Sequence, residues 1–95
     1  MAYAVVWSEN GGPPRAGSLE LGDGSLGFSG PPRRELPYGD VADVRIDRRP
    51  TFRLAGRPTL VLESRAGDTF RIASLDGPGT LHELLERLHS ARNAT

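Results

Sequence analysis

Residues 17–28 read Gly-Ser-Leu-Glu-Leu-Gly-Asp-Gly-Ser-Leu-Gly-Phe, and this stretch decides the fold class. Leucines alternate with polar neighbours before the Asp23-Gly24 pair, and Leu26 and Phe28 alternate with their neighbours after it. Alternation with a period of two is typical of half-buried strands. An Asp-Gly pair between two such runs indicates a hairpin, because a type I′ turn needs positive φ at both central residues. The stretch therefore predicts a β-hairpin closed by a type I′ turn at Asp23-Gly24.

Short apolar runs bounded by glycine and proline continue on both sides of this hairpin. They predict strands at residues 3–8, 34–38, 41–47, 59–64 and 69–74, and they leave room for a short strand at 51–54. Pro37 places its segment at a sheet edge or a bend, because proline cannot donate to a strand ladder. We therefore expect about seven short antiparallel strands.

One amphipathic helix is predicted at the end of the chain. Its apolar stripe, with the i, i+3, i+4, i+7 spacing of a single helix face, consists of Leu81, Leu84, Leu85 and Leu88. Thr80 and Glu83 fit a capping box, so the helix is expected to begin at Thr80, and Glu83 and Arg87 form a favourable i, i+4 pair. A bent sheet or open barrel capped by this helix would bury both the leucine stripe of the helix and the alternating apolar residues of the strands. The 95 residues thus predict one domain over residues 1–95, with no internal repeat.

The composition excludes several classes of function. Twelve Arg balance twelve Asp and Glu, and the chain holds neither lysine nor cysteine. Zero net charge argues against a general nucleic-acid or membrane-surface protein, and six aromatic residues offer few platforms for stacking bases. The missing residue types exclude thiol nucleophiles, cysteine-bound metals, Walker lysines and Schiff bases. We expect no nucleic-acid partner.

Two motifs with possible chemistry have simpler structural interpretations. Residues 22–27 match G-x-G-x-x-G, but strand-like alternation continues after them, whereas a dinucleotide site needs a helix there. His82, Glu86 and His89 lie along one side of the predicted helix, where amphipathic side chains commonly flank a core. We therefore predict no metal site and no cofactor. With no credible nucleophile or general base, we also predict no catalytic residues and no enzyme activity.

The N-terminus carries no targeting signal. Residues 1–7 have no basic start, and the apolar run ends at Ser8-Glu9, too soon for a secretory leader or a membrane span. We expect a soluble cytoplasmic protein. The exclusive use of arginine over lysine is typical of GC-rich genomes and indicates a bacterial source.

Three phrases of the sequence resemble the pleckstrin-homology-like (PH-like) superfamily, above all its bacterial PH and GRAM-like branches. They are Gly-x-Leu-x-Leu at residues 17–21, Leu-x-Phe-x-Gly at 26–30, and Leu-Pro-Tyr-Gly-Asp-Val-Ala-Asp-Val at 36–44. With the final glycine-turn hairpin and single helix, the resemblance covers roughly residues 3–92. It implies a bent seven-stranded sheet or open barrel closed by the C-terminal helix.

The resemblance also implies a ligand end formed by three loops, where this chain carries Arg15, Arg33, Arg34 and Arg65. Arginine guanidinium groups suit phosphate and carboxylate ligands. Residues 33–57 carry a net charge of +3 and the rest of the chain −3. These arginines are thus candidate binding residues for an anionic lipid headgroup or a phosphate ligand, or they are ordinary surface charges neutralised by nearby acids.

The sequence leaves three hypotheses for function. The first is a non-enzymatic PH-like binding or scaffold module that contacts a protein partner or forms homo-oligomers through sheet edges, with the residue 3–7 strand and the Pro37 segment as the expected exposed edges. The second is the loop-end anion site, whose binding should weaken with salt. The third, a metal site on the helix, requires His82 and His89 to converge on one point.

Overall fold

The computed structural model describes residues 2–29, 33–47 and 57–93. The elements in this part of the chain are β1 (Ala2–Glu9), β2 (Arg15–Leu21), β3 (Ser25–Phe28), β4 (Arg34–Pro37), the 3₁₀ turn η1 (Tyr38–Asp40), β5 (Val41–Asp47), β6 (Thr59–Ser64), β7 (Thr69–Ser74) and α1 (Pro78–Asn93). The short strand allowed at residues 51–54 lies outside the described residues.

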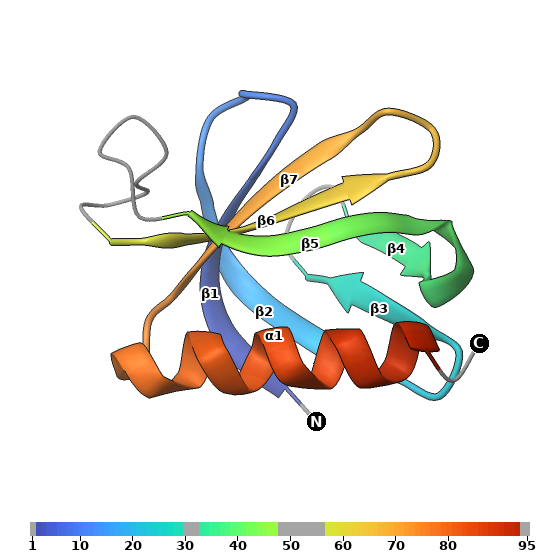
Figure 1. Cartoon of the computed structure of the whole chain (residues 1–95). Coiled ribbons are helices and arrows are strands. Elements are labelled where there is room, and N and C mark those ends of the chain that lie inside the picture. Colours follow the sequence, from blue (N-terminus) through green and yellow to red (C-terminus); the bar gives the residue numbers. More distant parts are fainter. Residues whose placement is uncertain (1, 30–32, 48–56, 94–95) are drawn as a thin grey trace.

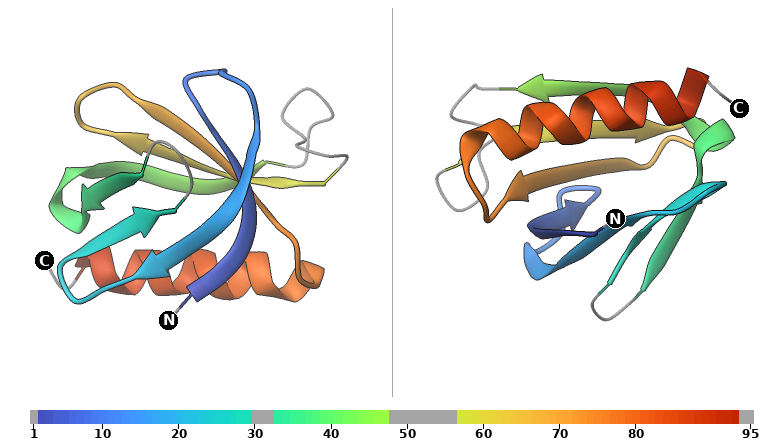
Figure 2. Two further views of the ribbon diagram at one scale, coloured as in Figure 1. Left: turned by 180° about the vertical axis from the view of Figure 1, so that it is seen from behind. Right: turned by 90° about the horizontal axis from the view of Figure 1, so that it is seen from below.

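All seven strands form one antiparallel sheet in the order β4-β3-β2-β1-β7-β6-β5. The sheet curls into a half-barrel, and α1 runs along its open side (Figure 1). The view from below shows α1 lying along β5, the element that it contacts most, and over β6 and β7 (Figure 2). The predicted fold class, a bent antiparallel sheet of seven strands capped by one C-terminal helix, is confirmed.

The core fills the concave side of the half-barrel. Its members, all of them buried, are Tyr3, Val5, Trp7, Leu19, Leu26, Phe28, Tyr38, Val41, Val44, Leu60, Leu62, Phe70, Ile72, Leu81, Leu84 and Leu88. At its centre the Phe28 ring stacks on both Trp7 and Phe70, with centroids 4.7 and 5.1 Å apart. The helix stripe and the strand stripes therefore bury each other as predicted. Leu85 differs from the other helix leucines, because it is only half-buried at the margin of this core.

The type I′ turn lies elsewhere than predicted. Neither Asp23 nor Gly24 has positive φ, whereas Asn10 and Gly11 have φ of 53° and 75°, and the Gly12 amide donates to the Glu9 carbonyl. The Gly22 carbonyl, which would close a turn around Asp23-Gly24, accepts the Tyr38 hydroxyl instead. The hairpin itself is correct, with Leu21 paired to Leu26. The prediction of its turn type was wrong, because a tertiary contact replaces the local hydrogen bond.

The helix begins two residues earlier than the capping box predicts. α1 starts at Pro78, and the Thr80 amide already donates to the Gly77 carbonyl. Thr80 therefore lies inside the first turn and is not the cap. Proline is well tolerated in the first helical turn, where its missing N–H is not needed.

The sheet edges also differ in part from expectation. β1 pairs with β2 on one side and with β7 on the other, so the expected exposed edge at residues 3–7 is wrong. Because the chain returns to β1 with its last strand, β1 becomes central. The Pro37 segment does form an edge, as β4, and β5 forms the other.

Gly17 of the Gly-x-Leu-x-Leu phrase has a steric role. A Cβ at this position would fall on the carbonyl oxygen of Ser29, which also accepts the Trp7 indole N–H at 3.3 Å. Only glycine lets β2 and the end of β3 approach this closely.

Candidate functional site

Two of the four predicted arginines lie at one mouth of the half-barrel, on its inner face. Arg15 is paired with Trp7 and Arg34 with Phe28, and paired residues share a face of the sheet. The Arg15 guanidinium lies 5.2 Å from the Trp7 ring centroid, in cation–π geometry, and its buried Nη1 has no hydrogen-bond partner among the described residues. Arg34 forms an ion pair with Glu9 at 2.9 Å. The mouth therefore contains two guanidinium groups and one carboxylate.

The other two predicted arginines do not join this pair. Arg33 is exposed, and its side chain extends beside Gly27. Gly27 lies on the outer face of the sheet, away from Arg15 and Arg34. Arg65 lies in the β6–β7 turn, but its Nε donates to the Gly39 carbonyl at 2.8 Å. The structure thus brings Arg15 and Arg34 to the same mouth and leaves Arg33 and Arg65 apart from them. Anion binding by these arginines remains a prediction.

The helix histidines are not gathered with other metal-ligand side chains in the part of the chain that the structure describes. His89 Nε2 lies 3.3 Å from the Val44 carbonyl oxygen of β5, so this side chain faces the sheet edge. Within residues 2–29, 33–47 and 57–93, no three acidic or histidine side chains gather closely enough to hold a metal ion. Nothing in this part of the chain supports convergence of His82 and His89 on one ligand.

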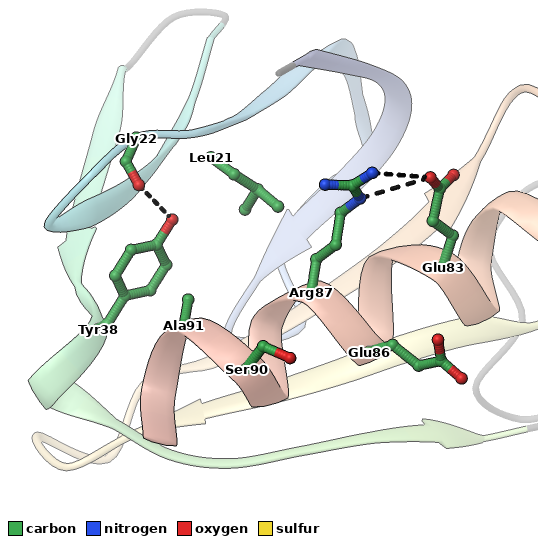
Figure 3. Close-up of a pocket in the computed structure, with 8 residues that line it drawn as sticks. All are labelled: Leu21, Gly22, Tyr38, Glu83, Glu86, Arg87, Ser90 and Ala91. Carbon is green, nitrogen blue, oxygen red and sulfur yellow. Dashed lines mark hydrogen bonds and ion pairs between the residues drawn. The ribbon is translucent and has the colours of Figure 1, made fainter. Parts of the chain in front are cut away.

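A groove lies between α1 and the β2–β3 hairpin, and we call it the α1 groove (Figure 3). It has a volume of about 600 Å³ and is lined by Leu21, Gly22, Tyr38, Glu83, Glu86, Arg87, Ser90 and Ala91. The end of β2, the turn η1 and one flank of α1 supply these residues. Burial of the leucine stripe fixes the rotation of α1, which turns its polar flank toward the groove.

The α1 groove combines apolar side chains with an acidic rim. Leu21 and Ala91 are half-buried, and both pack against the core. The Arg87 guanidinium pairs with Glu83 at 3.2 Å, whereas Glu86 is exposed and has no ion pair among the described residues. One arginine therefore faces two glutamates, and the rim carries a net negative charge.

Two buried tyrosines belong to the core, and one of them, Tyr38, also lines the groove. The Tyr38 hydroxyl donates to the Gly22 carbonyl at 2.8 Å, which ties η1 to the hairpin turn (Figure 3). Burial raises the pKa of Tyr38 above its ordinary value of 10.0, and the charge of Asp23 raises it further. Burial also raises the pKa of Tyr3, although the positive charge of Arg87 lowers it in part.

These tyrosines predict a loss of stability at alkaline pH. In the unfolded chain they ionise near pH 10, whereas the folded chain keeps both protons to higher pH. The contribution of these tyrosines to the free energy of unfolding should therefore be fully present below pH 10 and be lost as the pH rises through the folded pKa values. Because the chain has no lysine and no cysteine, no other side-chain type titrates in this range. Urea unfolding from about pH 8 to 11.5 measures the effect.

The variant Tyr3→Phe/Tyr38→Phe is the control for this pH dependence. It removes both ionisable hydroxyls, so its free energy of unfolding should change little over the same range. A wild-type stability that is independent of pH above 10 would contradict the prediction.

The two edge strands, β4 and β5, offer few free backbone groups for the addition of another strand. On β5, Arg92 Nη2 donates to the Ala42 carbonyl at 2.7 Å, and His89 contacts the Val44 carbonyl. α1 thereby occupies part of this edge. On β4, the Tyr38 amide points to β3, where it donates to Gly24.

Amides along a strand point alternately to its two sides, so in β4 residues 35 and 37 face away from β3. Pro37 has no amide hydrogen, and the Glu35 amide is therefore the one β4 donor that faces away from the sheet. Few backbone groups are therefore available to pair with another chain at either edge.

Comparison with solved structures supports the shape of the molecule. The chain superposes on the C-terminal domain of an unknown protein from Leishmania infantum with a TM-score of 0.77 and 13% identity, over 98% of this chain and 82% of that one. No protein-family model and no curated protein matches the chain. The shared feature is the fold alone, a curled antiparallel half-barrel with a C-terminal helix that is PH-like in shape. Among the described residues, no helix has the length and apolar character needed to span a membrane.

The α1 groove was not predicted from the sequence. The signal for its helix wall is present, because Glu83, Arg87 and Ser90 share the flank of α1 next to the leucine stripe. The opposing wall of the groove forms only where Tyr38 and the end of β2 lie next to that flank of α1. These contacts depend on the curl of the sheet, which alternation along single strands does not report.

Proposed function

We propose that this chain is a non-enzymatic PH-like binding module that holds a basic, partly apolar segment of a protein partner in the α1 groove. The observation that carries this proposal is the combination of an open hollow of about 600 Å³, half-buried apolar residues and the carboxylate of Glu86, which has no ion pair within residues 2–29, 33–47 and 57–93. A hollow of this size is within the range of binding pockets.

The chemistry of the groove favours one class of ligand. Leu21, Ala91 and the Tyr38 ring suit an apolar side chain, and Glu86 suits an arginine or lysine. An acidic rim disfavours phosphate and anionic lipid at this place. The blunted edges of β4 and β5 make side-chain docking in the groove a better supported mode of contact than strand addition.

The test is a titration with a labelled synthetic peptide that contains several arginines and two phenylalanines. We expect saturable binding that weakens about tenfold in Glu86→Arg, equivalent to about 1.4 kcal/mol. Ser90→Trp, which fills the groove from an exposed helix position, should weaken binding as well. Fluorescence anisotropy at low and physiological salt measures both effects.

The matched control is Glu20→Arg, the same charge reversal on the other face of β2 from Leu21. It should bind the peptide as the wild type does, and a peptide with aspartate in place of arginine should not bind the wild type. Absence of binding even at low salt, or equal loss in Glu20→Arg and Glu86→Arg, would overturn the proposal.

The second candidate function is anion binding at the mouth of the half-barrel. It is favoured by the buried Arg15 Nη1, which has no hydrogen-bond partner among the described residues. Inorganic phosphate and vesicles with anionic lipid are the probes, and Arg15→Met should weaken their binding while Glu86→Arg should not. Vesicles that never retain the wild type at low salt would exclude the lipid form of this function. The cytoplasmic location and bacterial source remain predictions.

A further inference from the structure

We propose that Asn10 is a site of covalent self-modification, at which its side-chain amide is lost through a succinimide formed with Gly11. The contacts of Asn10 with the β6–β7 turn set the rate of this reaction. The site shares no residue with the α1 groove, so the inference does not depend on the proposed function.

The chemistry needs only the Asn10-Gly11 pair and water. The Gly11 backbone nitrogen gives up its proton to water and attacks Cγ of Asn10 with its electron pair. The Cγ–Nδ2 bond then breaks, and the leaving nitrogen takes up a proton and departs as ammonia. Water opens the five-membered succinimide at either of its carbonyls, which leaves aspartate or isoaspartate at residue 10. Glycine favours the attack, because it has no side chain to shield its nitrogen.

The turn leaves the attacking nitrogen accessible. Asn10 and Gly11 are the two central residues of the type I′ turn, which is closed by the Gly12 amide on the Glu9 carbonyl. The Gly11 amide donates no hydrogen bond within residues 2–29, 33–47 and 57–93. A Cβ built on Gly11 would have no atom within 4 Å, so water reaches this side of the turn.

The amide that leaves is held, in contrast, by the start of β7. Asn10 Nδ2 donates to Oδ1 of Asp68 at 2.9 Å, and Asn10 Oδ1 accepts the Thr69 amide at 2.8 Å. The Asn10 backbone amide donates to the Thr69 carbonyl at 2.7 Å. These three bonds, which we call the Asn10 clasp, continue the pairing of β1 with β7 beyond Glu9 and Phe70. Cγ can turn toward the Gly11 nitrogen only after the two side-chain bonds open, so the clasp slows the reaction.

Loss of the amide removes the donor that Asp68 faces. In the aspartate product a carboxylate oxygen replaces Nδ2, and two like charges then oppose each other where a hydrogen bond was. Isoaspartate adds one carbon to the main chain and displaces the type I′ turn. Either product separates the β1–β2 turn from the β6–β7 turn. Because the released ammonia is not recovered, the change runs in one direction.

Mass spectrometry of protein incubated at mildly alkaline pH measures the reaction. The chain has no lysine and no glutamine, so trypsin releases its two side-chain amides separately, Asn10 in residues 1–15 and Asn93 in residues 93–95. We expect the wild type to lose the Asn10 amide well before the Asn93 amide. Asp68→Ala should lose it about tenfold faster than the wild type, because a hydrogen bond to a charged group no longer has to open first.

The matched control for the rate is Glu63→Ala. Glu63 lines the same surface hollow as Asn10 and Gly11, but its carboxylate pairs with Arg45. This variant should lose the Asn10 amide at the wild-type rate. The wild type unfolded in urea, which has no clasp, should lose the amide at least as fast as folded Asp68→Ala.

The consequence of the modification has its own test. Asn10→Asp reproduces the aspartate product and should lower the urea midpoint of unfolding. Asn10→Asp/Asp68→Asn exchanges the donor and the acceptor of the clasp, so it should restore most of that loss. A general sensitivity of residue 10 to substitution would not be reversed in this way.

Three outcomes would overturn the inference. The first is a wild type in which the Asn10 amide lasts as long as the Asn93 amide. The second is an Asp68→Ala variant that reacts at the wild-type rate, or a Glu63→Ala variant that is accelerated equally. The third is an Asn10→Asp variant with the wild-type midpoint of unfolding. Each of them leaves the proposed function of the α1 groove unaffected.

Discussion

Trp7→Ala is expected to lower the free energy of unfolding by about 3–5 kcal/mol, which is the usual range for removal of a buried large aromatic side chain. The Trp7 side chain is fully buried and stacks on Phe28, and its indole N–H donates to the Ser29 carbonyl. A domain of this size is stabilised by about 5–14 kcal/mol in total. The substitution should therefore leave the chain close to its unfolding threshold at 37 °C.

Urea unfolding followed by far-UV circular dichroism measures this loss. Fluorescence is unsuitable because Trp7 is the one tryptophan of the chain. Trp7→Phe is the control, since it keeps a ring against Phe28 and removes the hydrogen bond to Ser29, and it should cost about 1–2 kcal/mol. A loss below about 1 kcal/mol in Trp7→Ala would show that the aromatic cluster is not the centre of the core.

Leu84→Ala is expected to cost about 2–5 kcal/mol. Leu84 is 1% exposed and lies with Leu81 and Leu88 on the face of α1 that closes the half-barrel. Alanine has the highest helix propensity, so the loss reports packing and not helix formation. The same urea experiment gives its magnitude.

Leu85→Ala is the matched control on the neighbouring helix position. Leu85 is half-buried, and its truncation should cost about 1 kcal/mol because less apolar area leaves the core. Equal losses for the two variants would contradict the observed rotation of α1 over the sheet. A stable Leu84→Ala protein would show that the helix is not required to close the core.

The sequence predicts this fold well where the physical cause is local. Alternation in residues 17–28 defines the β2–β3 hairpin, and the spacing of Leu81, Leu84 and Leu88 defines the buried face of α1. The errors arise where a distant group intervenes. The hydroxyl of Tyr38 takes the carbonyl that would have closed a type I′ turn, and β7 covers the strand edge that was expected to be open.

The candidate site was less predictable than the fold for the same reason. Arg15 and Arg34 were candidates because the resemblance to the PH-like superfamily implied a ligand end at their loops, but the pairing of Arg34 with Glu9 joins the ends of two strands that are not neighbours in the sheet. The α1 groove depends on three elements that meet only when the sheet has curled. Residue types thus identify candidate charges, and tertiary pairing decides which of them face a ligand.

The central position of β1 affects how the chain folds while it is being synthesised on the ribosome. β1 can pair with β2 as soon as both emerge, but its other edge must wait for β7, whose Ser74 pairs with Val5 across most of the chain. At the usual pace of about 5–20 residues per second, synthesis of the roughly fifty residues between β2 and the end of β7 takes about 3–10 s. During this interval β1 presents an open edge to the β7 segment of any neighbouring nascent chain. Exchange of β7 between copies made on one messenger RNA is the misfolding route that this topology favours.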